Sequence, residues 1–104
     1  EGKALICFYR NKSFFGASGG WDISDCGTKV GSLRNGTYFY YFAEPGEHRY
    51  HSSFAFEKEI TAISLSAGDV RFIRAQLSGP LIVIPRQQAI EEIENELTVI
   101  GRHR

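Results

Sequence analysis

Residues 37–43 read Thr-Tyr-Phe-Tyr-Tyr-Phe-Ala, the stretch of this sequence richest in side chains that favour extended backbone. The residues that follow, Glu44-Pro45-Gly46-Glu47, match a type II turn, since Pro fixes φ at the second position and Gly supplies positive φ at the third. A hairpin closed by this turn pairs residue 43 with 48, 41 with 50 and 39 with 52. One face then points into the core and carries Phe39, Tyr41, Ala43, His48, Tyr50 and Ser52. The wetter face carries Tyr38, Tyr40, Phe42, Arg49, His51 and Ser53.

Turn signals divide the rest of the first 85 residues into further short strands. A second hairpin is predicted at Ala67-Gly68-Asp69, with Leu65 opposite Val70 and Ile63 opposite Phe72 on one apolar face. Other strands are expected at Lys3–Arg10, Trp21–Asp25, Thr28–Leu33 and Leu81–Ile84, the last one covered on both faces. All predicted strands therefore fall within residues 3–84.

The only convincing helical pattern follows Pro85 and runs from Arg86 to Leu97. Apolar residues recur there at three- and four-residue spacing, at Ile90, Ile93 and Leu97, while the glutamates occupy the solvated faces. This apolar stripe should dock on the domain or on a partner. Residues 98–104, with the basic Arg102-His103-Arg104, are expected to be a frayed tail.

The 104 residues suit one domain spanning 1–104. We predict a mainly β fold, an antiparallel β-sandwich of about seven or eight strands, immunoglobulin-like in shape, with one C-terminal helix. Twelve basic and twelve acidic residues give zero formal net charge, which argues against nucleic acid as a partner. The sequence holds no Met and no long apolar run, so compartment and anchoring have to be inferred by other means.

The two cysteines, Cys7 and Cys26, lie in none of the paired clusters typical of zinc sites. Cys7 in a strand is best interpreted as a small buried apolar residue. A disulfide between Cys7 and Cys26 is the alternative, and it would suit an oxidising compartment.

No pattern in the sequence predicts an enzyme, a cofactor or a metal site. His48 and His51 are three residues apart on a strand, so they point to opposite faces and cannot share an ion. Asp25 and Asp69 fall at turns, where Asp bonds to nearby backbone. The glycine-rich residues 16–20 lack the lysine of a phosphate-binding loop and lead into a strand.

Two clusters of aromatic and basic residues remain as candidates for binding a ligand or partner. The first surrounds the loop at residues 11–20 and comprises Arg10, Phe14, Phe15 and Trp21, with Lys12 nearby. An exposed ring there could stack on a sugar, a peptide or a base, whereas buried rings would instead close the end of the sandwich. The second comprises Tyr40, Arg49 and His51 on the wetter hairpin face, which the helix could alternatively cover.

Several motifs, in order, resemble a bacterial envelope family of unknown function. They are Gly2-Lys3-Ala4-Leu5-Ile6 leading to Phe8-Tyr9-Arg10, then Val30-Gly31-Ser32-Leu33, Asn35-Gly36-Thr37-Tyr38-Phe39, Glu44-Pro45-Gly46-Glu47-His48 and Ala67-Gly68-Asp69-Val70. Two features depart from the family pattern. The turn Asp25-Cys26-Gly27 is one residue longer, and the cysteine that would carry a lipid near the start is absent.

The resemblance implies a small secreted or lipid-anchored protein with an immunoglobulin-like or PEGA-like β-sandwich and no established catalytic residues. We therefore expect a non-enzymatic module in the periplasm or on a removed N-terminal lipid anchor, binding a protein or cell-wall component. The alternative is a structural accessory domain that presents its C-terminal helix to a larger assembly. The motifs do not identify the partner or the oligomeric state.

Overall fold

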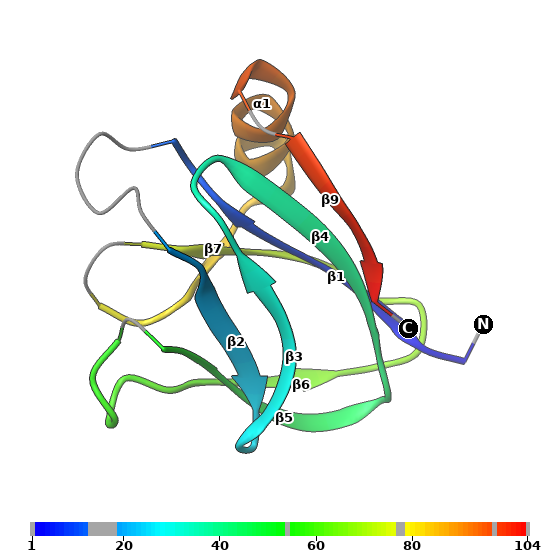
Figure 1. Ribbon diagram of the computed structural model, residues 1–104. Coiled ribbons are helices and arrows are strands. Elements are labelled where there is room, and N and C mark those ends of the chain that lie inside the picture. Colours follow the sequence, from blue (N-terminus) through cyan, green and yellow to red (C-terminus); the bar gives the residue numbers. More distant parts are fainter. Residues whose placement is uncertain (1, 13–18, 54, 77–78, 97, 104) are drawn as a thin grey trace.

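Strands make up most of the computed structural model, which describes residues 2–12, 19–53, 55–76, 79–96 and 98–103, with backbone only at 95–96 and 98–103. Nine strands and one helix occur in these ranges (Figure 1). The strands are β1 (Ala4–Arg10), β2 (Trp21–Asp25), β3 (Thr28–Leu33), β4 (Thr37–Ala43), β5 (Gly46–Ser52), β6 (Thr61–Leu65), β7 (Val70–Ala75), β8 (Ile82–Ile84) and β9 (Thr98–His103). The helix is α1 (Arg86–Glu96).

The strands form two sheets that pack face to face. One, the mixed sheet, has the order β8-β7-β1-β4-β9, and the other, the antiparallel sheet, has the order β3-β2-β5-β6. The predicted mainly β, two-layer fold with one C-terminal helix is confirmed. The expectation that every strand pair is antiparallel is wrong, because β1 with β7 and β4 with β9 run parallel.

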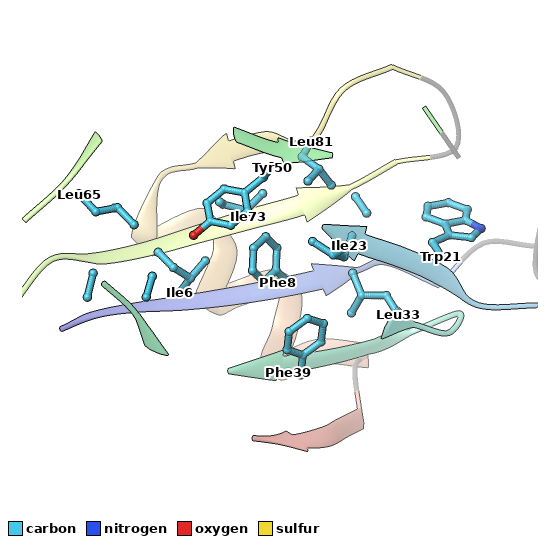
Figure 2. Close-up of a cluster of buried hydrophobic side chains, with 13 residues drawn as sticks. Ile6, Phe8, Trp21, Ile23, Leu33, Phe39, Tyr50, Leu65, Ile73 and Leu81 are labelled. Carbon is cyan, nitrogen blue, oxygen red and sulfur yellow. The ribbon is translucent and has the colours of Figure 1, made fainter. Parts of the chain in front are cut away.

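Aromatic side chains from both sheets meet in the core (Figure 2). The ring of Phe8 in β1 lies 5.4 Å from that of Phe39 in β4 and 5.1 Å from that of Tyr50 in β5. All three side chains are fully buried, as the inward face of residues 39–52 predicts for Phe39 and Tyr50. Burying each such ring contributes about 1.5–3 kcal/mol, so this contact between layers is a main stabilising term.

The predicted hairpin at Pro45-Gly46 does not exist. Ala43 pairs with Ala4 of β1, whereas His48 pairs with Ile63 of β6, so the chain crosses from one sheet to the other at this turn. The sequence marks where the chain reverses but carries no local signal for which sheet the next strand joins. The prediction of which side chains point inward survives, because strand alternation does not depend on the pairing partner.

The predicted hairpin at residues 67–69 is wrong for the same reason. Backbone bonds join this turn to the start of β1, from Gly68 N to Lys3 O and from Leu5 N to Asp69 O. β7 therefore enters the mixed sheet beside β1, and Ile73, not Phe72, points between the sheets. Val70, predicted to be buried, is 40% exposed.

The C-terminal quarter differs from its prediction in three respects. The helix ends at Glu96, one residue before the expected Leu97, which lies outside the described residues. The tail is strand β9, which returns beside β4 (Figure 1). β8 is an edge strand with Val83 exposed, and it is not covered on both faces.

Gly31 in β3 provides a test of how closely the two sheets approach. A Cβ atom at this position would lie 2.7 and 2.8 Å from ring carbons of Phe39 in the opposite sheet. We expect Gly31→Ala to lower the free energy of unfolding by about 2 kcal/mol, because the core cannot expand without cost. Urea unfolding measures the change, with the exposed Thr28→Ala as control. A loss under about 0.5 kcal/mol would contradict this packing.

Candidate functional site

Side chains from β4, β7 and α1 enclose a groove on the outer face of the mixed sheet. Alternation along β4 places Tyr38 and Tyr40 on this face, opposite the core-facing Phe39. Their rings stand edge to face, with centroids 5.7 Å apart. The volume of the groove is about 340 Å³, and we call it the aromatic groove; its lining residues are Tyr38, Tyr40, Phe72, Ile90, Ile93 and Glu94.

The strand β1 contributes a small side chain, Cys7, to the floor of the sheet beneath the groove. Cys7 of β1 pairs with Tyr40 on one side and with Phe72 on the other, so a cysteine separates two large rings across three strands. The thiol is buried, and that burial raises the pKa of Cys7 to about 12. Cys7 is therefore a neutral packing residue, as predicted, and not a nucleophile.

The helix supplies the other wall of the groove. Ala89 is fully buried in a cluster with Tyr9 and Ile84, and Ile93 packs against that cluster. Ile90 and Glu94 are four residues apart and so share the side of α1 that faces the groove. Of the predicted apolar stripe, Ile93 packs on the domain itself, Ile90 lines the groove, and Leu97 lies outside the described residues. Ala89 is a docked residue that the sequence pattern did not indicate.

A glutamate fastens the helix to the sheet. The Glu92 carboxylate accepts a hydrogen bond of 2.6 Å from the Tyr9 hydroxyl and bonds of 2.9 and 3.1 Å from Arg74, and Gln88 donates a further one. Burial alone would raise the pKa of Glu92, but these hydrogen bonds and the charge of Arg74 outweigh it and lower the pKa. Burial, together with the bond to Glu92, raises the pKa of Tyr9.

Glu92 corrects the expectation that the glutamates of the helix are solvated. Its position gave a signal, because it lies three residues after Ala89 and one before Ile93, at the border of the docked face. Both of its carboxylate oxygens accept hydrogen bonds from Tyr9, Arg74 or Gln88. Glu92 therefore holds the helix in place.

A second polar cluster joins β2 to β5 at the other sheet. His48 donates from Nδ1 to the Asp25 carboxylate at 2.5 Å and from Nε2 to the Glu44 carbonyl at 2.6 Å. Two donated hydrogen bonds require a proton on each ring nitrogen, so this geometry favours the protonated form of the imidazole. Burial lowers the pKa of His48, but the two hydrogen bonds and the charge of Asp25 raise it more, and the net direction is upward.

This arrangement gives His48 and Asp25 a structural role. Both ring nitrogens of His48 are engaged in hydrogen bonds, and the second oxygen of Asp25 accepts from the Arg49 amide. The His48 ring also stacks on Tyr50, with centroids 5.5 Å apart. The sequence suggested a turn role for Asp25 and gave no sign of this pairing, which depends on the crossing between sheets at residues 44–46.

The loop cluster predicted to bind ligands is partly interior. Arg10 and Trp21 are 1% and 3% exposed, and the guanidinium lies over the indole, 3.6 Å from the ring centre (Figure 2 shows Trp21). Arg10 also donates to the Leu33 carbonyl at 2.9 Å, joining β1 to β3. These two residues close one end of the sandwich, as the alternative to ligand binding predicted for Trp21. Phe14 and Phe15 lie outside the described residues.

The second predicted cluster is divided between the two sheets. Tyr40 lines the aromatic groove, whereas Arg49 and His51 belong to β5 of the antiparallel sheet. Arg49 is exposed, and His51 shares a 3.0 Å hydrogen bond with the Phe56 carbonyl. Phe56 is 78% exposed, so the surface around Arg49, His51 and Phe56 is a second candidate. We call it the β5 surface.

The predicted alternative of a disulfide is wrong, because both cysteines are free, Cys7 buried and Cys26 exposed in the turn after β2. Among the described residues, no group of three His, Cys, Asp or Glu side chains could hold a metal ion. No helix in the described ranges has both the length and the apolar character needed to cross a membrane.

The architecture defines a small β domain of two packed sheets with one docked helix. Residues 1–86 match the family model described as "Protein of unknown function (DUF2846)", and the chain belongs to that family. The match ends where α1 begins, so the helix and β9 lie beyond the matched residues. Searches of curated proteins and of solved structures found no match.

The His48 cluster predicts a particular dependence of stability on pH. Because the folded pKa is raised above 6.5, the cluster stabilises fully below that value, and the benefit is lost as pH rises through the folded pKa. We expect His48→Gln to cost about 1–2 kcal/mol near pH 6 and progressively less at higher pH. Urea unfolding across this range measures the difference. His51→Gln is the control, and a cost for His48→Gln that does not change with pH would contradict the assignment.

Proposed function

We propose that this chain is a non-enzymatic binding module of the bacterial cell envelope, which holds part of a protein or cell-wall component in the aromatic groove. The observation that carries the proposal is the groove itself. Its volume of about 340 Å³ lies in the range of small-ligand sites. Such sites combine apolar and aromatic walls with few polar groups, and here those groups are two tyrosine hydroxyls and Glu94.

A binding role accounts better for the ionisable residues than catalysis does. The two most developed polar clusters, around Glu92 and around His48, use their acceptor and donor atoms to join elements of the fold. Neither lies among the residues that line the groove. The groove residues themselves offer stacking surfaces and one carboxylate, which suit recognition.

The envelope location rests on the resemblance of the sequence motifs to a bacterial envelope family, and it is part of the proposal. The groove favours binding over the alternative of a structural accessory domain. In that alternative α1 is offered to a larger assembly, but its buried Ala89 and half-buried Ile93 pack on the sheet of the same chain. A partner would therefore meet the groove between helix and sheet, not the apolar side of the helix.

Site-specific photo-crosslinking tests the proposal. A photoreactive amino acid replaces Ile90 in the groove, and in a matched protein it replaces Ile60, an exposed apolar residue outside the groove lining. We expect adducts with one defined envelope protein or cell-wall fragment from position 90 and none from position 60. Unlabelled Ile90→Arg should not compete for the adduct, whereas unlabelled Ile60→Arg should compete like the wild type.

A third probe at Phe56 reports on the β5 surface. Adducts from position 56 without adducts from position 90 would overturn the groove as the site. Equal labelling from all three positions would mean non-specific association and would also contradict the proposal. Circular dichroism and thermal unfolding of each variant confirm that it has folded.

A further inference from the structure

The aromatic groove combines three aromatic rings with one carboxylate. Tyr38, Tyr40 and Phe72 supply the rings, and Glu94 supplies the charge. The face of an aromatic ring carries partial negative charge and attracts cations, most strongly where water is excluded. A carboxylate at the edge of such a site adds a full negative charge. Among the side chains that the structure describes, none of those lining the groove is a Lys or an Arg.

The charge of Glu94 is available to a ligand. No ion pair or hydrogen bond of its side chain occurs within the described part of the chain, in contrast to Glu92 with Arg74 and Gln88. The two glutamates are two residues apart on α1, which places them on opposite sides of the helix. Arg74 is engaged by Glu92 on one side, while Glu94 faces the groove on the other.

We propose that the aromatic groove recognises an organic cation, an alkylammonium group such as a lysine side chain or an amine-bearing cell-wall peptide, with the cation over the rings and beside Glu94. This inference rests on the proposed function and adds the chemical class of the ligand. Ile90 and Ile93 contact the methylene chain that leads to the ammonium group. An anionic ligand would be repelled by the Glu94 carboxylate. A neutral sugar would make no use of the negative charge of Glu94.

A pair of small probes of nearly equal shape separates charge from hydrophobicity. Choline is the cation, and 3,3-dimethylbutan-1-ol is its neutral isostere. Each is titrated into the isotopically labelled chain while the ring resonances of Tyr38 and Tyr40 are followed by NMR. We expect saturable shifts with choline, and an affinity for the neutral compound about five- to tenfold weaker. Nα-acetyl-lysine methylamide should shift the same resonances.

Variants assign the charge to one residue. Glu94→Gln keeps the shape of the side chain and should weaken choline binding about fivefold, while Glu91→Gln, at an exposed residue of the same helix that does not line the groove, should leave it unchanged. Tyr38→Leu keeps an apolar wall but removes a ring, and it should weaken choline more than the neutral isostere. Glu94 is exposed, so its replacement leaves the fold intact.

The outcomes distinguish this inference from the proposed function. Equal affinity for both probes, or full choline binding by Glu94→Gln, would overturn the cation assignment and leave a groove that binds by apolar contact. No shift of groove resonances with any of the three probes would also overturn the assignment, while crosslinking from position 90 would still support the binding site. Failure of both experiments would overturn both proposals.

Discussion

The position of α1 against the mixed sheet is the constraint on which the groove depends. The sheet buries Ala89 of the helix and packs against Ile93, and Tyr9 and Arg74 fix the rotation of the helix by holding Glu92. A helix of 11 residues would be marginal alone in water, so its stability comes from this docking. Because Glu92 and Glu94 lie on opposite sides of the helix, the contact that binds one of them to the sheet also directs the other to the groove.

The two packed sheets support the docked helix. The contact of Phe8 with Phe39 and Tyr50 holds the sheets together, and Arg10 over Trp21 closes one end. The hydrogen bonds of the His48 ring join the crossing between the sheets to β2. Charged groups in the interior are thus used to join strands that are distant in sequence. The aromatic surface that remains open lies outside the core, on the other face of the mixed sheet.

Much of the fold could be predicted from the sequence, and the reasons for the failures are physical. Alternation fixed Phe39 and Tyr50 as core residues, and the spacing of Ile90 and Ile93 predicted the helix. The choice of sheet after Pro45 and after Gly68 depends on contacts far away in the chain, which local turn chemistry does not encode. Of the predicted binding residues that the structure describes, Tyr40 alone lines the groove, and Arg10 and Trp21 are interior. Glu94 was missed because an exposed helical glutamate looks like any other.

Docking of α1 on the mixed sheet is tested most directly by nuclear Overhauser effects in the native chain. We predict strong cross-peaks from the Ala89 methyl group to the ring protons of Tyr9 and to the methyl groups of Ile84, together with slow amide exchange along α1. Absence of these cross-peaks, with exchange in the helix as fast as in an unfolded peptide, would mean that the helix is not held there, and the groove would not exist.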